Sequence, residues 1–430
     1  MSHLQPSLIE HISVVLADKN LNPPYKFAVA YSGGLDSTVL LHAMVHWREI
    51  DPSIQVRAIH INHQLQEEAN IWQEQCAEFC QSHDVDLISE KVKVIDSGKG
   101  LEAAARQARY SVFKNTLQVD EILLTAHHQN DQAETLMLRL LRGCGVEGAS
   151  AMQIIKPLKS GWLMRPLLSY SRQQLEDYAR KEGLAWVDDP TNASSVYDRN
   201  FLRNEIFPNI ALRWPAYQQT LSRFTNSSGE HNALLQSYII EDFEKCKSGD
   251  ELDIAVLLSL EEIKQKYIIR HWIQNKSYDM PSESQLQEIF KLIHARDDAI
   301  PVVAWADYEI RRFQNKVYLM QKLPEFDSSL CMVWNSEDFV EIPGSGTISC
   351  INGQGAKLGG KLFIKFRQGG EKCAIKTRQG RHSLKKLFQE NDVPPWLRDR
   401  MPIIYQDNDI VAVPNIFSNL ENSSFTWLKE

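Results

Sequence analysis

Several features are absent from this sequence of 430 residues, and each absence removes a class of protein. No run of ~18 apolar residues occurs, so we expect no membrane-spanning helix and no membrane partner. The first ten residues lack a basic segment followed by an apolar core, so we expect no secretory signal peptide. The seven cysteines are odd in number and scattered, which fits reduced thiols better than a disulfide framework. These absences together predict a cytoplasmic protein.

An excess of positive charge is absent as well. The formal net charge is −8, which argues against a protein that binds nucleic acid over its whole surface. Residues 361–400 differ, because they hold eleven Lys/Arg and four Asp/Glu. This basic segment is compatible with a polyanion that docks at one place, and a solvated basic face explains it equally well.

Strand-like and helix-like segments alternate in the first third of the chain, which predicts βαβ units and a Rossmann-like, mostly parallel sheet with helices on both faces. In such a sheet the ligand site lies outside the carboxyl ends of the strands. The expected strands are Phe27–Tyr31, Val56–Ile61, Leu87–Val94 and Glu121–Ala126, and the expected helices are Ser37–Trp47, Glu67–Ser82, Leu101–Leu117 and Asp131–Arg142.

The character of the chain changes twice after this region. Pro208 and Pro215 mark a boundary, after which residues 216–325 are mainly helical by pattern. The tail, residues 326–430, has Gly-rich turns and short alternating strands. We therefore expect an α/β protein with a catalytic domain at 1–215, a helical middle domain and a small mixed α/β C-terminal domain. The length fits this number, since ~150 residues per domain predicts two to four.

The most informative stretch, residues 32–37, reads Ser-Gly-Gly-Leu-Asp-Ser and follows the first expected strand. Gly33 and Gly34 permit a tight turn and the close approach of a bound group. Free N–H groups at the start of the next helix suit an anion such as phosphate, and the hydroxyls of Ser32 and Ser37 add donors. The string resembles the pyrophosphate loop, SGGxDS, of the N-type ATP-pyrophosphatase superfamily, whose members split ATP into AMP and pyrophosphate. We favour this interpretation over that of a simple turn.

Two other glycine-rich stretches do not indicate nucleotide binding. Residues 143–148 match G-x-G-x-x-G but follow an expected helix instead of a strand. Residues 355–361 nearly match a Walker loop, but Leu362 stands where Ser or Thr must hold Mg²⁺.

A second group of polar residues follows the fourth expected strand. Asp131 and Glu134 lie one turn apart on one helix face. Capping of that helix by Asn130 and Asp131 is one interpretation. Recognition of a cation at the strand ends is the other, and we favour it because acidic clusters in clefts are candidates for functional sites.

Histidine and arginine pairs supply further candidates. His60 and His63 end the second expected strand and lack partners at metal-site spacing, so hydrogen bonding to a nucleotide or substrate competes with a structural role. Two arginine pairs share a helix face and could meet either phosphate or solvent: Arg106 with Arg109, and Arg199 with Arg203.

A series of motifs resembles the tRNA(Ile)-lysidine synthetase family. The resemblance covers nearly all of the chain and is weakest in the helical middle. It implies an adenine nucleotide alpha hydrolase-like catalytic domain, a helical middle domain and a C-terminal domain that helps to grip the tRNA. The motifs are Ser-Gly-Gly-Leu-Asp-Ser (32–37), His-Ile-Asn-His-Gln-Leu (60–65), Arg-Gln-Ala-Arg-Tyr (106–110), Ala-His-His-Gln-Asn-Asp-Gln-Ala-Glu-Thr (126–135), Arg-Gly-Cys-Gly (142–145), Asp-Pro-Thr-Asn (189–192), Arg-Asn-Phe-Leu-Arg-Asn (199–204), Phe-Arg-Gln-Gly-Gly-Glu (366–371) and the segment 384–398.

The resemblance also implies a reaction. ATP would adenylate the C2 oxygen of the wobble cytidine (C34) in the CAU-anticodon isoleucine tRNA, and the ε-amino group of free L-lysine would then displace AMP to form lysidine. The codon read would change from AUG to AUA. The implied roles are ATP binding by Ser32, Gly33, Gly34, Leu35, Asp36, Ser37 and His60, Mg²⁺ placement by Asp36, lysine binding by Asp131 and Glu134, and charge stabilisation by His127, Arg109 and Arg203 or Arg199.

Three alternatives from other classes remain open. A tRNA 2-thiolation enzyme with the same loop would use paired cysteines, but the sequence has no CxxC, and Cys76 and Cys80 lie within an expected helix. Amide synthesis of the GMP-synthetase kind would require a glutaminase-like domain, which we do not find. A catalytically silent tRNA-binding protein would not need the loop with Asp36 and the acidic pair.

Overall fold

The structure is a computed structural model that describes residues 4–64, 66, 68–94, 100–188, 194, 197–276, 279–296, 301–334, 339–352, 361–420 and 423–429. The motif at 189–192 and the Walker-like stretch at 355–360 lie outside the described residues. The chain divides into two compact units, Met1–Gln236 and Ser237–Glu430. In the part of the chain that the structure describes, no helix is long and apolar enough to cross a membrane.

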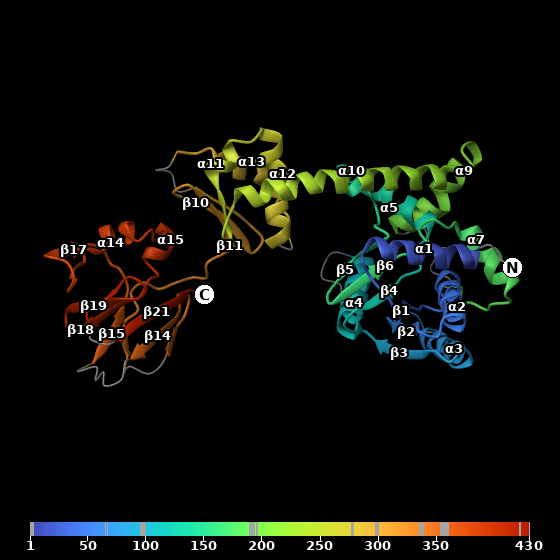
Figure 1. Ribbon diagram of the computed structural model, residues 1–430, viewed down its shortest axis with the longest axis horizontal. Coiled ribbons are helices and arrows are strands. Elements are labelled where there is room, and N and C mark those ends of the chain that lie inside the picture. Colours follow the sequence, from blue (N-terminus) through green and yellow to red (C-terminus); the bar gives the residue numbers. More distant parts are fainter. Residues whose placement is uncertain are drawn as a thin grey trace. The chain divides into compact units, whose positions relative to one another are not determined.

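The first unit contains a six-stranded sheet with the strand order β3-β2-β1-β4-β6-β5 (Figure 1). Neighbouring strands from β3 to β6 are parallel, and β5 pairs antiparallel with β6 at one edge. The parallel sheet expected from the sequence is confirmed. Its strands are β1 (Lys26–Ala30), β2 (Gln55–Asn62), β3 (Asp86–Lys91), β4 (Glu121–Leu124), β5 (Ile155–Leu158) and β6 (Gly161–Met164).

Helices cover both faces of this sheet because its central strand is apolar on both sides. Phe27 and Val29 of β1 are fully buried in a core with α1, α2, α3 and α7, whereas Ala28 faces the opposite core, which includes Phe113 of α4. Burial of a side chain such as Phe27 contributes about 1.5–3 kcal/mol. The helices are α1 (Leu4–Asp18), α2 (Leu35–Ile50), α3 (Ala69–Ser82), α4 (Leu101–Thr116), α5 (Gln129–Leu141), α6 (Val146–Ala149) and α7 (Arg172–Lys181).

A buried histidine joins α2 to α7. His42 Nδ1 lies 2.9 Å from the hydroxyl of Tyr178. Burial, together with the neighbouring His46 and His83, lowers the pKa of His42 to about 4. The ring in the folded protein is therefore neutral near pH 7. In the unfolded chain the same residue has a pKa of ~6.5, so it binds a proton as the pH falls below that value.

We expect the stability of this unit to fall as the pH drops from about 6.5 toward 4. In that window the unfolded chain binds a proton at His42 that the folded chain does not, so acid favours unfolding. The midpoint of thermal unfolding, measured from pH 7 to pH 4.5, should fall less steeply in the variant His42→Gln. An unchanged slope in that variant would contradict this account of His42.

Past α7 the chain forms α8 (Asp198–Phe201), a π-helical turn (Leu202–Ile206) and α9 (Phe207–Arg213), which precede the long helix α10 (Tyr217–Cys246). A π-helical turn is rare and often marks a functional site. Helix α10 is fixed to α5 by a buried amide: Gln132 donates to Thr225 of α10 (3.3 Å) and to the carbonyl of Met152 (2.9 Å). This contact secures the helix that carries Asp131 and Glu134.

The second unit begins with helices and a five-stranded antiparallel sheet of order β7-β8-β11-β10-β9. The middle region contains the expected helices, but the sequence pattern did not predict this sheet. In β10, Glu309 and Arg312 are buried, so the alternation of polar and apolar residues that marks a strand is hidden. The elements are β7 (Lys247–Ser248), β8 (Glu251–Asp253), α11 (Ile254–Leu258), α12 (Glu262–Lys276), α13 (Glu283–Ile293), β9 (Val302–Trp305), β10 (Tyr308–Phe313) and β11 (Lys316–Gln321).

The rest of the second unit is the mixed α/β region expected from the sequence. Three sheets, of order β12-β15-β18-β19-β20, β13-β14-β21 and β16-β17, share a core that includes Trp334, Phe366 and Phe388. The elements are β12 (Met332–Trp334), β13 (Phe339–Ile342), β14 (Gly346–Asn352), β15 (Leu362–Lys365), β16 (Lys372–Ala374), β17 (Arg381–Ser383), α14 (Leu384–Glu390), α15 (Pro395–Arg398), β18 (Ile403–Gln406), β19 (Asp409–Val413), β20 (Phe417–Ser418) and β21 (Ser423–Lys429).

Candidate active site

The loop between β1 and α2 is held in shape by its own side chains. The Ser37 hydroxyl accepts the N–H of Ser32 (3.2 Å), lies 3.0 Å from the Ser32 hydroxyl and donates to the carbonyl of Gly34 (3.0 Å). Gly33 has a φ of +81°, and its carbonyl accepts the N–H of Val187 (2.9 Å). Helix α2 begins at Leu35, so its first N–H groups lie in this loop and suit an anion.

The two glycines of the loop should respond differently to alanine. A Cβ at Gly33 would lie 2.9 Å from Sγ of Cys76 in a left-handed backbone, whereas a Cβ at Gly34 would first meet the Ser32 hydroxyl at 3.5 Å. We expect Gly33→Ala to lower the free energy of unfolding by about 1–3 kcal/mol and Gly34→Ala to change it by less than about 0.5 kcal/mol. Urea-unfolding midpoints of the two variants test this, and equal midpoints would contradict it.

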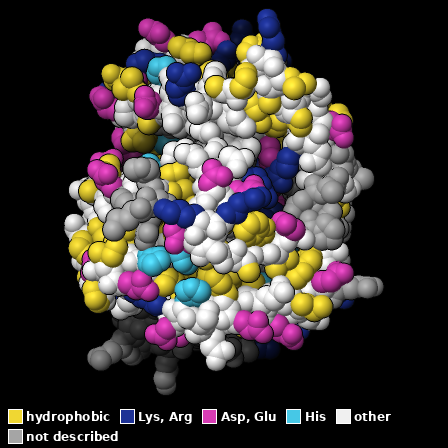
Figure 2. All heavy atoms as spheres, turned by 90° about the vertical axis from the view of Figure 1, so that its right-hand side faces the viewer, with side chains coloured by type: hydrophobic (Ala, Val, Ile, Leu, Met, Phe, Trp, Pro, Cys, Tyr) yellow, Lys and Arg dark blue, Asp and Glu magenta, His cyan; other side chains and the backbone are white. Residues whose placement is uncertain are grey.

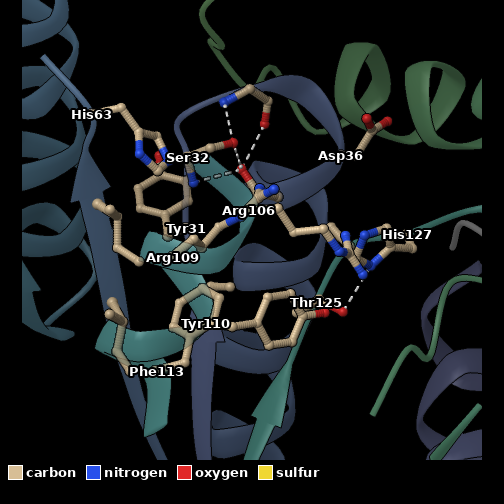
Figure 3. A pocket seen from close by; sticks show the side chains of 16 residues that line it. Tyr31, Ser32, Asp36, His63, Arg106, Arg109, Tyr110, Phe113, Thr125 and His127 are labelled. Carbon is tan, nitrogen blue, oxygen red and sulfur yellow. Dashed lines mark hydrogen bonds between the residues drawn. The ribbon is translucent and has the colours of Figure 1, made fainter. Parts of the chain in front are cut away.

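A pocket of about 280 Å³ opens beside the loop at the carboxyl ends of β1, β2 and β4 (Figure 3). In this view Arg106 and Arg109 of α4 lie between the Ser32 loop and the rings of Tyr110 and Phe113. The lining residues are Ala30, Tyr31, Ser32, Gly34, Asp36, Ser37, Ile59, Ile61, His63, Arg106, Arg109, Tyr110, Phe113, Thr125, Ala126 and His127.

The positive charge of this pocket comes from arginine and not from histidine. Burial lowers the pKa of His127 to about 3, and burial together with Arg109 lowers the pKa of His63 to about 4. Both rings are therefore neutral near pH 7, and Nδ1 of His127 lies 2.9 Å from the Thr125 hydroxyl. The Arg106 guanidinium lies over the ring of Tyr110, 4.9 Å from its centroid. Two arginines beside a donor-rich loop form a suitable site for a polyphosphate.

Two of the expected nucleotide-binding residues do not line the pocket with their side chains. Leu35 is 4% exposed and packs in the core below the loop. His60 is 5% exposed, and its Nδ1 lies 3.0 Å from the carbonyl of Tyr31. Burial lowers the pKa of His60, although this carbonyl contact opposes the change. His60 therefore contacts the backbone of the residue that follows β1 and precedes Ser32.

The acidic pair of α5 lies in a separate cluster with the two expected arginines. Glu134 is 1% exposed. Its carboxylate accepts a hydrogen bond from Nε of Arg203 at 2.7 Å and lies 3.1 Å from Nε of Arg199. Asp131 Oδ1 lies 3.4 Å from the Arg203 guanidinium. Arg203 belongs to the π-helical turn and contacts both carboxylates. The structure thus brings four of the expected site residues together, outside the lining of the loop pocket.

One histidine connects this cluster to the loop. His128 Nε2 lies 3.6 Å from Oδ2 of Asp36 and 3.5 Å from Oδ2 of Asp131. Asp36 also lies 3.4 Å from the guanidinium of Arg172 in the first turn of α7. Among the described residues, Oδ1 of Asp36 is buried and has no hydrogen-bond partner. This oxygen is therefore available to a ligand or a cation.

His128, Arg172 and Tyr110 have no predicted role from the sequence. His128 is the N-cap of α5, which begins two residues earlier than expected, and Asp131 is the third helical residue of the capping box. Asp131 thus takes part in capping α5, as one interpretation predicted, and also contacts an arginine of the cluster. The adjacency of His128 to His127 was the only local signal for its position.

Comparison with known proteins decides the family. A PP-loop domain model matches residues 5–210, a TilS substrate binding domain model matches residues 252–318, and a TilS substrate C-terminal domain model matches residues 362–425. The tRNA(Ile)-lysidine synthase of Coxiella burnetii is 39% identical over 94% of this chain and 91% of its own length. The enzymes of the same name from Alkalilimnicola ehrlichii (95% of this chain, 92% of its own) and Shigella flexneri (93% and 96%) are 37% and 36% identical.

The chain belongs to the tRNA(Ile)-lysidine synthase family. With this membership it is an ATP-using enzyme of the PP-loop class, as residues 32–37 predicted. A solved structure of the U34-tRNA thiolase NcsA from Methanococcus maripaludis aligns with a TM-score of 0.44 and 17% identity over 53% of this chain and 80% of that chain. That likeness is too low to bear on function.

The cysteines of this lysidine synthase family member do not favour the sulfur-transfer alternative. All seven are free thiols. Cys76 and Cys80 are buried in α3, and burial raises their pKa values to about 12 and about 11. A sulfur carrier needs an accessible thiolate, which these two residues do not provide.

Proposed function

We propose that the chain ligates the ε-amino group of L-lysine to C2 of the wobble cytidine (C34) in the CAU-anticodon isoleucine tRNA. ATP first adenylates the C2 oxygen and releases pyrophosphate. The lysine amine, after losing a proton, then bonds to C2, and AMP leaves with the oxygen. The modified anticodon reads AUA in place of AUG, and the identity of the tRNA changes from methionine to isoleucine.

One observation carries this proposal: the loop that suits pyrophosphate and the acidic pair of α5 are joined by direct contacts. From Asp36 the contacts run through His128 to Asp131 at 3.6 and 3.5 Å, and from Asp131 to Arg203 at 3.4 Å. An activated base at the loop and an amine at α5 would therefore meet within one site. Holding two reactants in this way supplies a large part of the rate enhancement of a ligase.

The roles at the nucleotide end follow from the loop. The N–H groups at the start of α2 and the hydroxyls of Ser32 and Ser37 bind the pyrophosphate, with Arg109 and the neutral His127 beside it. The buried, unpartnered oxygen of Asp36 fits Mg²⁺, which takes one or two carboxylates together with phosphate oxygens. No group of three or more His, Cys, Asp or Glu side chains that could hold a metal ion occurs among the described residues. The ion would neutralise phosphate charge.

The roles at the amine end follow from α5. Asp131 and Glu134 bind the cationic groups of lysine, and Arg203 and Arg199, which hold these carboxylates in the absence of lysine, stabilise the charge on the adenylate. Although burial opposes it, the neighbouring His128 lowers the pKa of Asp131 to about 2, and the backbone N–H of His128 contributes, so this carboxylate is ionised near pH 7. A charged carboxylate is what an ammonium group requires.

We place the tRNA contacts on the middle and C-terminal domains, residues 216–325 and 326–430. Figure 2 faces the side of the first unit that carries α2 and α7 in Figure 1, where Lys/Arg and Asp/Glu side chains are mixed and do not mark a site for a polyanion. In the C-terminal region, Phe363 and Tyr405 are directly opposite on neighbouring strands, and Lys365 lies 5.8 and 4.9 Å from their ring centroids. Aromatic rings beside a cation suit bases and phosphates.

The proposed function is tested with ATP, Mg²⁺, labelled lysine and the CAU isoleucine tRNA, with the CAU methionine tRNA as the control. We expect label in the isoleucine tRNA alone. If neither tRNA is labelled but ATP is still cleaved to AMP when tRNA is present, the loop adenylates a substrate as proposed, and lysine is rejected as the nucleophile. Incorporation of labelled sulfur under the same conditions would replace the proposal with thiolation.

A further inference from the structure

His128 makes contacts in this site beyond its part in the start of α5. It is 2% exposed and forms the N-cap of α5. Its Nδ1 accepts the backbone N–H of Asn130 at 3.2 Å, so the ring proton is on Nε2. That nitrogen faces two carboxylate oxygens at 3.6 and 3.5 Å, one from Asp36 and one from Asp131. Both distances exceed an ordinary hydrogen bond, so the nitrogen lies between the two carboxylates without a short bond to either.

The two carboxylates need a group between them. Since each lies within 3.6 Å of one nitrogen, their oxygens are at most about 7 Å apart, close enough for two negative charges to repel at the low dielectric of a protein. Each also has an arginine on its outer side: Arg172 lies 3.4 Å from Asp36, and Arg203 lies 3.4 Å from Asp131. Without a central donor, repulsion and these outer arginines would draw the two carboxylates apart.

We propose that His128 is a positioning residue that holds Asp36, at the nucleotide end, and Asp131, at the lysine end, in a fixed relation. The inference rests on the proposed function, in which these two carboxylates serve the two reactants. Nε2 of His128 lies within 3.6 Å of both carboxylates. His128 thereby aligns the amine with the activated base without touching either.

Replacement by asparagine separates this role from helix capping. Asparagine is a preferred N-cap whose side-chain oxygen accepts the same N–H group, so His128→Asn keeps the start of α5. Its short side chain has no second donor that reaches both carboxylates. His128→Ala removes both the cap and the bridge. His46→Asn is the matched control, because it removes a histidine contact to a carboxylate (Glu49, 2.8 Å) elsewhere on the helix that carries Asp36.

The experiment measures two steps in the full chain. Label from [α-³²P]ATP on the isoleucine tRNA without lysine reports adenylation, and loss of that label on adding lysine reports transfer. We expect His128→Asn to melt at the wild-type temperature, to form the adenylate, and to transfer lysine ~10–100-fold more slowly with a raised KM for lysine, the usual cost of losing an orienting partner. His46→Asn should match the wild type in both steps.

Each other outcome counts against the proposal. A folded His128→Asn variant with transfer within about twofold of the wild type would show that only the cap matters. If His128→Asn does not fold, His128→Ser, which also provides a capping oxygen, is measured in the same way. If neither variant folds, the residue serves the helix start and the proposal is overturned. A wild-type protein that never transfers lysine would instead reject the proposed function itself.

Discussion

Replacement of Asp36 by asparagine should lower the turnover of lysidine formation by about 10²–10³-fold while the protein stays folded. Asp36 is the one acidic residue that lines the loop pocket, and its Oδ1 has no hydrogen-bond partner among the described residues. Asp36 would act through the Mg²⁺ that it helps to hold beside the phosphates, and loss of one group that stabilises developing charge typically costs this much. Its contribution to α2 as an acidic residue in the first turn is only about 0.3–1 kcal/mol.

The measurement is the rate of pyrophosphate release in the presence of the isoleucine tRNA, together with the melting temperature. A large loss of rate at a nearly unchanged melting temperature is the expected result. If Asp36→Asn released pyrophosphate at the wild-type rate, the carboxylate would have no part in handling the triphosphate, and the assignment of Mg²⁺ to it would be wrong.

Replacement of Asp131 by asparagine should raise the KM for lysine by about 10–100-fold and change the KM for ATP much less. Asparagine can still accept the backbone N–H of His128, which Asp131 Oδ2 accepts at 3.0 Å, so the helix start is kept. What is lost is the charge that an ammonium group needs, and a hydrogen bond to a charged group is worth about 1.5–3 kcal/mol.

The matched control is Asp198→Asn. Asp198 pairs with the exposed Arg142 at 3.7 Å in the first turn of α8, and both side chains are mostly in solvent. This variant should keep both KM values. An Asp131→Asn enzyme with the wild-type KM for lysine would remove lysine binding from α5, and the cluster with Arg203 would then be structural.

Motifs that are continuous in the sequence could be predicted without the structure. The loop at 32–37, the strands of the parallel sheet and the acidic pair of α5 were each recognised from a short, local pattern of residues. The five-stranded sheet of the second unit could not, because buried Glu309 and Arg312 break the pattern of β10. Local patterns could be read from the sequence, whereas a strand with buried charged side chains could not be recognised from them.

The contacts that assemble the candidate site could not be predicted, because they join segments that are distant in the sequence. Arg203 and Glu134 are far apart in the chain, and nothing in their local sequence indicates that they pair. The position of Arg172 beside Asp36 likewise requires α7 to pack on α2. Sequence also could not show that the side chain of His60 turns toward the carbonyl of Tyr31, since both sides of β2 are buried.

The most direct test of the central claim follows the phosphate of ATP and then the amine. The wild-type enzyme is incubated with [α-³²P]ATP, Mg²⁺ and the CAU isoleucine tRNA, first without lysine and then with it. The account predicts ³²P on the tRNA in the first stage, and its release as AMP with one lysine gained per label lost in the second. Lysine incorporated without any labelled tRNA intermediate, or labelled tRNA that lysine does not discharge, would contradict it.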